Sequence, residues 1–454
     1  MKSYDVAIIG SGPGGYVAAL YASRHKINVC VIEKDLVGGT CLNHGCIPTK
    51  SFLNSASIIN TIKSASGFGI DVEGFRIDFQ KISGRKDEVV SRLRTGIETL
   101  FKANNIDLIK GVARLSGPHS IIINEAETIN SQNIIVAVGS SAAELAGISF
   151  DHSSILSSSS VLDLKQLPAS MCVIGGGVIG CEFASFFNAL GTKVTIIELM
   201  DRLIPMQSRE VSRKIDTIFR KKGIDVFTSS KIESIENPGP LKIKTDKGAE
   251  FFTEKVLVSV GRRPNTAGLG LEEAGVKMDQ SRVRVDEDLR TTVPGIYAIG
   301  DCVVGPLLAH KASYDGILAC DNIMGKSRKV DYSNIPSCIW TEPQIASVGL
   351  SEDDARSRLT DVKIAKFPYL ASGKAYLLGK HEGFVKIIGT SKGDILGVEI
   401  FGEEACELIG EAVLAKTSGI NIKDWAGIVH GHPTLSEILQ EAAHVFCGTG
   451  IHTV

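Results

Sequence analysis

Two cysteines lie five positions apart in a glycine-rich segment, where residues 38–46 read GGTCLNHGC. Five residues of a straight helix rise about 7.5 Å, so Cys41 and Cys46 can form a disulfide if the turn between them is distorted. Strained, accessible disulfides are the reducible ones. The alternatives are two structural thiols or half of a metal site. Since no second Cys/His pair at zinc spacing occurs, we expect no metal and interpret the pair as a redox disulfide.

A second candidate for chemistry lies near the C-terminus, where residues 430–437 read HGHPTLSE. His432 precedes a predicted helix and Glu437 falls on its first turns. A carboxylate can hold an imidazole in one tautomer and leave its other nitrogen free to take a thiol proton. A lone histidine near a helix start is more often structural. A redox cysteine pair in the same chain favours the interpretation as a general base.

A glycine-rich turn opens the chain, with Gly10, Gly12 and Gly15 between a predicted strand and a predicted helix. The first glycine permits the tight turn, the second lets the backbone approach a pyrophosphate, and the third lets helix and strand pack closely. Glu33 follows at the end of the next strand, where a carboxylate can bind both ribose hydroxyls. With all these parts in place, the turn predicts a dinucleotide site.

The same pattern recurs 165 residues later with Gly175, Gly177 and Gly180, and Glu198 stands at the same spacing as Glu33. A carboxylate at that position would repel a 2′-phosphate, so the second site favours NAD over NADP. Arg202, four residues further on, is the one feature against that preference. Two dinucleotide sites in one chain indicate electron transfer from one dinucleotide to the other.

The composition is that of an ordinary globular protein: 454 residues, 43% hydrophobic, 22% charged, with a formal net charge of -2. A near-neutral chain without basic runs gives no reason to expect nucleic acid or an anionic membrane as a partner. No 18-residue apolar stretch occurs, and nothing resembles a signal or transit segment, so we expect a cytoplasmic protein. Four cysteines scattered among apolar residues are expected to be buried and reduced: Cys30, Cys172, Cys320 and Cys338.

The chain therefore predicts an α/β protein with two Rossmann-like domains and a C-terminal α+β domain. Short β-branched runs cover 134–138 and 256–260, and each is expected to be a later strand of one of these sheets. Another short strand is expected at 297–301. The last segment, from about Pro336, mixes strands at 384–388 and 395–401 with helices at 405–418 and 435–446.

Taken together, these motifs resemble the flavoprotein disulfide reductase family over essentially the whole chain. The resemblance implies FAD and NAD as cofactors and a homodimer. It also implies four domains: FAD-binding (1–148), an inserted NAD-binding domain (149–266), a central domain completing the FAD site (267–335) and a dimer-interface domain (336–454).

The resemblance also assigns roles to residues. Cys41 would be the sulfur that the substrate attacks, Cys46 would lie against the flavin, and His432 would reach the cysteine pair of the other subunit. Lys50 would approach the flavin and pair with Glu182. The remaining residues expected around the two dinucleotides are Thr40, Gly111, Gly139, Ile179, Gly261, Arg262, Asp301 (at the FAD ribityl chain), Ala309 and His310.

Within the family, the TLSE that follows His432-Pro433 and the sequence around the cysteines are most similar to the branch that oxidises dihydrolipoyl groups with NAD. The implied partners are the lipoyl domains of acyltransferases or of H-type proteins of glycine cleavage. Three positions depart from the family pattern: Val138, His44 and Gly431. Reductases of glutathione-like disulfides or of mercuric ion, and a mainly structural subunit of a multienzyme complex, are the alternatives.

Overall fold

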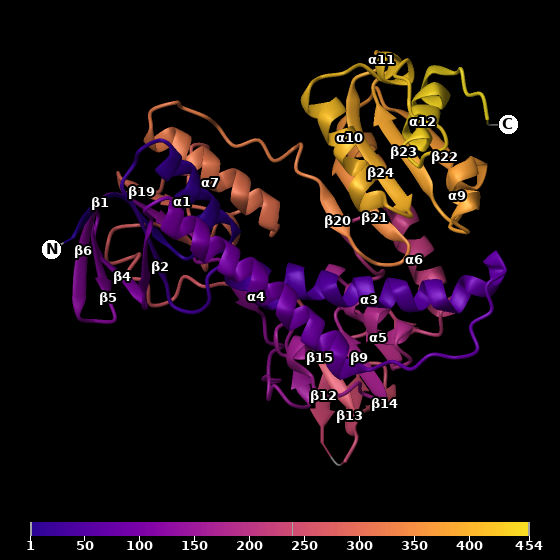
Figure 1. The fold of residues 1–454 in the computed structure, drawn as a ribbon, viewed down its shortest axis with the longest axis horizontal. Coiled ribbons are helices and arrows are strands. Elements are labelled where there is room, and N and C mark those ends of the chain that lie inside the picture. Colours follow the sequence, from indigo (N-terminus) through magenta and orange to yellow (C-terminus); the bar gives the residue numbers. More distant parts are fainter. Residues whose placement is uncertain (1, 238, 453–454) are drawn as a thin grey trace.

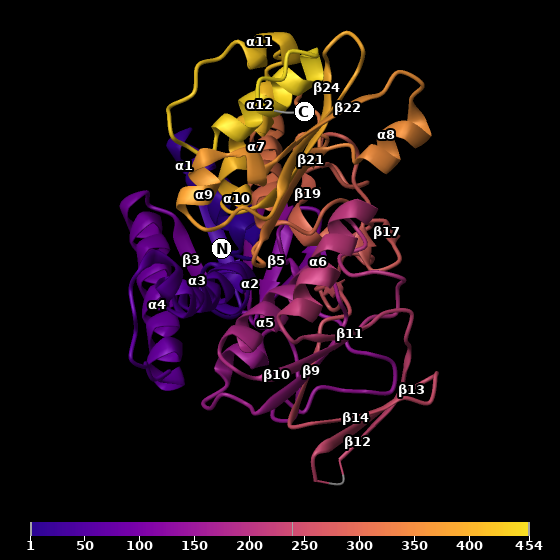
Figure 2. The ribbon, with the colours of Figure 1, turned by 90° about the vertical axis from the view of Figure 1, so that its right-hand side faces the viewer.

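The structure is a computed structural model and describes residues 2–237 and 239–452. Three lobes make up the molecule (Figure 1). The first sheet lies at the left, the second sheet at the bottom, and the C-terminal sheet at the upper right. Figure 2, turned by 90°, shows the C-terminal lobe above the second sheet, with α6 (Arg209–Lys221) between them. No described helix is long and apolar enough to span a bilayer.

The first sheet has the order β3-β2-β1-β6-β5-β4, with β19 also pairing with β6. Strands β1, β2, β3, β6 and β19 pair in parallel, whereas β4, β5 and β6 pair antiparallel. Successive residues of β6 enter opposite cores, Ile134 on one face and Ile135 on the other, so this sheet is buried on both sides. The bounds are β1 Ser3–Ile9, β2 Val29–Glu33, β3 Asp107–Lys110, β4 Ala113–Gly117, β5 Ser120–Ile123, β6 Glu127–Val136 and β19 Ile296–Ala298.

Two helices cover the first sheet side by side, α1 (Pro13–Arg24) and α7 (Ala309–Ile323) (Figure 1). Their backbones approach so closely that a Cβ on Gly316 would lie 2.5 Å from the carbonyl oxygen of Gly14. The segment from 267 onward thus returns to the first lobe, where β19 completes the sheet. A short hairpin in that segment joins β17 (Met278–Asp279) to β18 (Arg282–Val283).

The second sheet is parallel throughout, in the order β11-β10-β9-β15-β8. Its helix α6 carries buried Val211, Ile215, Ile218 and Phe219 on one stripe, and Ser208 caps it by accepting from the Val211 amide. A three-stranded antiparallel sheet extends from this lobe. The other bounds are β8 Ile155–Leu156, β9 Ser170–Ile174, α5 Val178–Ala189, β10 Lys193–Ile197, β11 Asp225–Phe227, β12 Ile232–Glu236, β13 Leu241–Thr245, β14 Glu250–Thr253 and β15 Lys255–Val258.

The chain leaves the first lobe and re-enters it through two adjacent strands, β7 (Ser140–Ala142) and β16 (Arg262–Pro264), which pair antiparallel. Two long helices, α3 (Cys46–Ser64) and α4 (Phe79–Ala103), run from the first lobe across to the second (Figure 1). Phe52 of α3 stacks on Phe186 of α5, with ring centroids 4.6 Å apart. The redox segment is therefore packed directly against the second nucleotide-binding lobe.

The C-terminal lobe is an antiparallel sheet in the order β20-β21-β24-β23-β22, on which α10 and α12 pack. An ion-pair cluster joins this lobe to α6, because Lys386 Nζ lies 2.8 Å from Glu210 Oε2. The bounds are β20 Ser337–Ile339, β21 Gln344–Gly349, α8 Glu352–Arg358, β22 Lys363–Pro368, α9 Gly373–Leu377, β23 Phe384–Gly389, β24 Ile395–Gly402, α10 Ala405–Thr417, α11 Ile422–Ala426 and α12 Glu437–Cys447.

This architecture confirms the predicted fold class, but three predicted strands end too late. The strands expected to run to Val138, Val260 and Asp301 end at Val136, Val258 and Ala298. In the first two, the chain turns away from the sheet at a glycine with positive φ, Gly139 at 65° and Gly261 at 130°. The predicted helix at 435–446 begins two residues later, at Glu437.

Candidate active site

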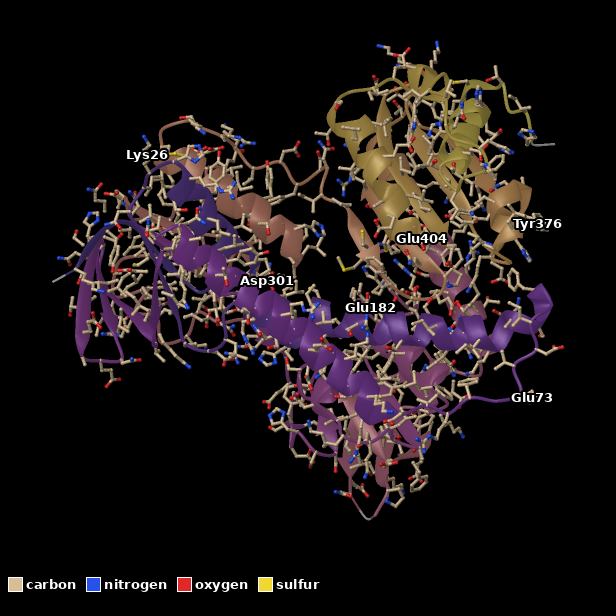
Figure 3. The ribbon with its side chains drawn as sticks, in the orientation of Figure 1. Lys26, Glu73, Glu182, Asp301, Tyr376 and Glu404 are labelled. Atoms are coloured by element: carbon tan, nitrogen blue, oxygen red, sulfur yellow. The ribbon has the colours of Figure 1, made fainter. Side chains whose placement is uncertain are left out.

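A cavity of about 1410 Å³ lies where the lobes meet. Pockets for drug-sized ligands usually occupy about 300–1,000 Å³, so this cavity suits something larger. Both glycine turns, the cysteine segment, the start of α7 and part of β20 line it. Figure 3 shows Asp301 and Glu182, which both line it, near the middle of the molecule.

The first glycine turn sits at the carboxyl end of β1, beside Glu33 at the end of β2. The two strands are in register up to Ile9 and Ile32, and the Gly10 amide then donates to Ile32 O at 2.8 Å. Glu33 Oε2 accepts from the amide of Ser11 at 2.8 Å. The carboxylate is thus held at the mouth of the turn, where it can bind a ribose.

The second turn repeats this arrangement. The Gly175 amide donates to Ile197 O at 2.9 Å, and Glu198 Oε2 accepts from the Gly176 amide at 2.5 Å. Glu198 Oε1 accepts from the amide of Met200 at 2.6 Å. Since both carboxylates are held by equivalent backbone amides, the internal repeat predicted from the sequence extends to the hydrogen bonds of its acids.

The glycines of the two turns have different structural roles. A Cβ at Gly12 or Gly177 would meet no atom within 4 Å, so the backbone there is open toward the cavity at the start of a helix. Both turns therefore fit a dinucleotide pyrophosphate, which binds backbone amides at a helix N-terminus. Gly15 and Gly180 lie outside the cavity lining. A Cβ on either would lie within about 2 Å of Gly10 O or Gly175 O, so these two glycines pack helix against strand, as their motif position predicts.

The two predicted redox cysteines are brought together by a break between two helices. Cys41 lies in α2 (Gly39–His44) and Cys46 begins α3. Gly45 between them has φ −149° and ψ −112°, far from helical values, which is the distortion that the spacing requires. In this reduced state the Cys41 thiol donates a hydrogen bond to Cys46.

The electrostatics of the pair are unequal. The hydrogen bond from Cys41, opposed by burial and assisted by the Lys50 ammonium, lowers the pKa of Cys46 to about 7. The same hydrogen bond and burial raise the pKa of Cys41 far above its usual range. Cys46 is therefore the sulfur that carries negative charge near neutral pH, and Cys41 is the one that keeps its proton.

Lys50 and Glu182 form the ion pair expected from the family resemblance. Lys50 Nζ lies 2.8 Å from both carboxylate oxygens of Glu182, which is buried on α5. Glu182 Oε1 also accepts from the Trp340 amide at 2.9 Å. The ion pair therefore joins α3 to α5, and the bond to Trp340 joins both to the residue that follows β20.

We expect Lys50→Met to raise the pKa of Cys46 from about 7 toward the ordinary thiol value of about 8.5, because a nearby positive charge is lost. In the unchanged, fully reduced protein, Cys46 is protonated below pH 7 and becomes a thiolate as the pH rises through 7. The rate of Cys46 alkylation against pH measures this, and its midpoint should move up in the variant. The matched control is Lys26→Met, an exposed lysine of the same lobe. An unmoved midpoint in Lys50→Met would contradict the assignment.

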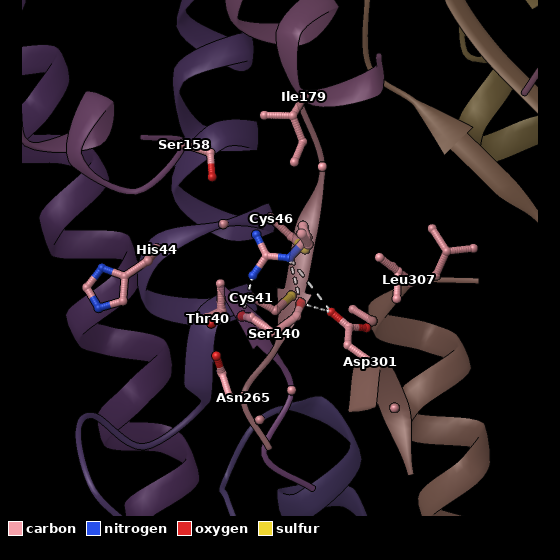
Figure 4. A pocket seen from close by; sticks show the side chains of 18 of the residues that line it. Thr40, Cys41, His44, Cys46, Ser140, Ser158, Ile179, Asn265, Asp301 and Leu307 are labelled. Carbon is pink, nitrogen blue, oxygen red and sulfur yellow. Dashed lines mark hydrogen bonds and ion pairs between the residues drawn. The ribbon is translucent and has the colours of Figure 1, made fainter. Parts of the chain in front are cut away.

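A polar group of three residues lines the cavity beside the thiols (Figure 4). Arg262 Nε donates to Ser140 Oγ at 2.7 Å and lies 3.8 Å from Asp301 Oδ2. The Ser140 hydroxyl also donates to Asp301. Most of the other predicted cofactor residues line the same cavity: Gly10, Thr40, Gly111, Gly139, Gly175, Ile179, Gly261, Ala309 and His310.

The predicted His–Glu pair is formed, but away from this cavity. His432 Nδ1 lies 2.9 Å from Glu437 Oε1, and Glu437 Oε2 accepts from the Thr434 amide at 2.7 Å. Although partial burial opposes it, these two hydrogen bonds hold the pKa of Glu437 below its usual range. The His432 side chain is 81% exposed and is not part of the cavity lining. The oriented imidazole therefore has its other nitrogen open to a partner outside its own chain.

Comparisons with known proteins agree with this arrangement. The sequence profile of the pyridine nucleotide-disulphide oxidoreductase family matches residues 4–316, and the profile of that family's dimerisation domain matches residues 335–443. The chain belongs to this family. It is an oxidoreductase of the kind that uses FAD and NAD, and its last lobe is a dimerisation domain.

Individual relatives cover the whole chain. A dihydrolipoyl dehydrogenase of Chlamydia pneumoniae is 42% identical over 99% of this chain and 98% of its own length, and one of Bacillus subtilis is 39% identical over 99% of each. Among solved structures, LpdA of Mycobacterium tuberculosis matches with a TM-score of 0.91 at 26% identity, covering 98% of this chain and 99% of its own. The flavoprotein disulfide reductase RclA of Escherichia coli, in a Cu(II) complex, matches with 0.89 at 28%, covering 98% and 100%.

Arg202, which opposed the predicted preference of this oxidoreductase for NAD, does not line the cavity. Its guanidinium donates to Pro205 O at 3.2 Å and to Asp201 Oδ1 at 3.2 Å. Glu198 does line the cavity. Of these two charged residues, only the carboxylate of Glu198 therefore lies on the cavity wall.

We expect Glu198→Ala to lower kcat/KM for NAD by about 10- to 100-fold, the loss of about 1.5–3 kcal/mol for a hydrogen bond to a charged group. The ratio of NAD to NADP activity should fall because the repulsion of a 2′-phosphate is also lost. Arg202→Ala is the control and should leave the ratio unchanged. A ratio unaltered in Glu198→Ala would show that nucleotide choice is made elsewhere.

The three departures from the family pattern fall into two kinds. Val138 and His44 line the cavity, and His44 Nε2 lies 3.8 Å from Asp35 Oδ2. Gly431 is next to His432, where a Cβ would lie 3.6 Å from Thr434 Cγ2, an ordinary contact. An alanine would therefore fit at 431 without displacing the histidine.

The sequence prediction missed one feature of the cavity wall. Cys30, Cys172 and Cys320 are buried, as expected, and burial raises their pKa values to about 12. The same expectation is wrong for Cys338, which is only half-buried and lines the cavity. Its neighbour, 68 residues later in the sequence, is Cys406, whose Sγ lies 3.6 Å from Ile339 O and whose thiol interacts with that of Cys338. Nothing in the sequence spacing marks these two cysteines as a pair.

Proposed function

We propose that this chain acts as a dihydrolipoyl dehydrogenase, which oxidises protein-bound dihydrolipoyl groups to the cyclic disulfide and delivers the electrons to NAD. The observation that carries the proposal is the Cys41–Cys46 pair, with its unequal pKa values, on the wall of a cavity bounded by two dinucleotide turns. The names and full-length identities of the relatives support the same substrate.

In the oxidised resting state, Cys41 and Cys46 would be joined by a disulfide. A thiolate of the dihydrolipoyl group attacks Cys41 Sγ, forming a mixed disulfide and releasing Cys46 as a thiolate. The second dihydrolipoyl thiol then attacks the other lipoyl sulfur, the one bonded to Cys41. This closes the lipoyl ring and releases Cys41. Two electrons and two protons leave the substrate, and the low pKa of Cys46 makes it the better leaving group.

His432 is the group proposed to take the substrate's proton. Its Nδ1 bonds to Glu437, so the tautomer is fixed and Nε2 is left to accept. Because the imidazole is exposed and outside the cavity of its own chain, we propose that it serves the cysteine pair of the other subunit of a homodimer.

The two dinucleotides have distinct proposed sites. Gly10, Gly12, Glu33, Gly111, Gly139 and Asp301 would hold FAD, with Thr40, Lys50, Ala309 and His310 near its ring; Gly175, Gly177, Ile179, Glu198, Gly261 and Arg262 would hold NAD. Bound FAD supplies a two-electron acceptor beside the thiols, and NAD supplies the final hydride acceptor. The chain's own contribution is to orient both and to tune Cys46 through Lys50 and Glu182.

The proposed partners are lipoyl-bearing domains, either of the acyltransferases of 2-oxoacid dehydrogenase complexes or of H-type proteins of glycine cleavage. A lipoyl group sits on a flexible arm, so its carrier needs access to the thiols and not a large fixed interface. The half-buried Cys41 on the cavity wall is compatible with such an arm.

The test is a steady-state assay of the FAD-loaded protein with dihydrolipoamide, NAD and NADP. Rapid NADH formation with NAD preferred is the expected result. NADPH-driven reduction of glutathione-like disulfides or mercuric ion, with negligible turnover of dihydrolipoamide, would overturn the substrate and leave the family intact. A folded, flavin-bearing protein without turnover on any of these would favour a structural subunit.

A further inference from the structure

A second pair of thiols lies at the edge of the same cavity, outside the residues that the proposed function uses. Cys338 is in β20 and lines the cavity, while Cys406 is the second residue of α10. Cys406 Sγ lies 3.6 Å from Ile339 O, the carbonyl of the residue after Cys338, and its amide donates to Gln344 Oε1 at 3.0 Å. The start of α10 is thus fastened to the β20–β21 hairpin, and the thiols of Cys338 and Cys406 interact.

The pair repeats the asymmetry of Cys41 and Cys46. The hydrogen bond from the Cys406 thiol, opposed by burial and assisted by the Lys50 ammonium, holds the pKa of Cys338 below its usual range. The same hydrogen bond and burial raise the pKa of Cys406. Fully buried cysteines such as Cys172 have a raised pKa and no thiol partner. A partly exposed cysteine with a lowered pKa and an adjacent thiol is the arrangement of a redox-active pair.

We propose that Cys338 and Cys406 form a second redox dithiol, which exchanges with low-molecular-weight disulfides that enter the cavity. Cys338 attacks one sulfur of the small disulfide, forming a mixed disulfide and releasing one thiol. Cys406 then loses its proton and attacks Cys338 Sγ, which displaces the other half as a second thiol. The pair loses two electrons and two protons, and the small disulfide gains both.

The new disulfide would fasten β20 to α10, whose second residue already contacts the β20–β21 hairpin through its amide and its sulfur. Lys50 connects it to the first pair, because its charge acts on both Cys46 and Cys338. The inference does not depend on the substrate proposed above, and the measurement below needs no turnover.

The test treats the reduced, FAD-loaded protein with hydroxyethyl disulfide, blocks remaining thiols by alkylation, and maps the peptides by mass spectrometry without reduction. The expected product joins the peptides of Cys338 and Cys406 and lacks two hydrogens. In Cys406→Ser the exchange should stop half-way, leaving a hydroxyethylthio group on Cys338. Cys447→Ser, a half-buried cysteine elsewhere in the same lobe, is the control and should still give the joined peptides.

Two results would overturn the proposal. One is a Cys338 that remains alkylatable both in the unchanged protein and in Cys406→Ser. The other is a hydroxyethylthio adduct that persists on Cys338 in the unchanged protein, since Cys406 would then fail to resolve it. The flavin absorbance of each variant reports whether it is folded, and the measurement on the unchanged protein requires no substitution.

Discussion

Cys46→Ser is expected to abolish dihydrolipoamide oxidation while the protein keeps its FAD. The proposed exchange needs a disulfide between Cys41 and Cys46, and a serine cannot form one. The substitution replaces one sulfur at the first position of α3, next to Gly45, and leaves the glycine turns and the Lys50–Glu182 pair in place. Turnover with dihydrolipoamide and NAD measures the effect, and Cys41→Ser should behave in the same way.

Electron transfer from NADH to an artificial dye acceptor is the control for this prediction. That reaction bypasses the thiols, so both serine variants should retain it if their dinucleotide sites are intact. Cys447→Ser should retain both activities, because its sulfur lies outside the cavity lining. Substantial dihydrolipoamide oxidation by Cys46→Ser would mean that the Cys41–Cys46 disulfide is not the group that accepts the substrate's electrons.

The two nucleotide-binding lobes could be predicted because their information is local. Each βαβ unit places its glycines and its acid within a single short stretch, and backbone chemistry at a turn depends on few neighbours. The two units also match in detail, because equivalent backbone amides donate to Glu33 and to Glu198. The thiol pair could be predicted for the same reason, because Cys41 and Cys46 lie in one short segment. The structure places the required distortion at Gly45.

The ends of the strands could not be predicted as well from the sequence. Val138 and Val260 continue the apolar runs of β6 and β15, yet their side chains line the cavity beyond the end of each strand. An apolar pattern indicates that side chains contact other apolar groups. It does not indicate whether the backbone is hydrogen-bonded to a neighbouring strand. The three-stranded sheet β12–β13–β14 and the pairing of β7 with β16 were not predicted at all. The second is a long-range pairing, whose register local periodicity does not encode.

Tertiary proximity also explains the second thiol pair. Cys338 lies among apolar residues, which predicted a buried, reduced cysteine, and Cys406 lies on a helix 68 residues later. Only the packing of α10 against the β20–β21 hairpin brings them together. The separation of His432 from the cysteines is a related case: the motif predicted the Glu437 contact, while the exposure of the imidazole comes from the fold.

His432→Gln is expected to lower kcat with dihydrolipoamide by about 10²–10⁴-fold, the usual contribution of a positioned general base. Glutamine keeps the size of the side chain and can bond to Glu437, but it cannot take a proton. Glu437→Gln should cost less, because the histidine would remain and lose only the carboxylate that orients it. Dye reduction by NADH should be unaffected in both variants.

The location of this base can be decided by pairing two inactive chains. Chains carrying Cys46→Ser and His432→Gln, co-expressed with different tags, can be purified as a mixed dimer. If the histidine serves the other subunit, one site of that dimer combines both defects, while the other combines an intact cysteine pair with an intact histidine. The mixed dimer should then recover half the activity of the unchanged dimer. If the histidine serves its own chain, each site carries one defect and the mixed dimer should be as inactive as its parents. Because His432 is 81% exposed and absent from the cavity lining of its own chain, recovery is the expected result.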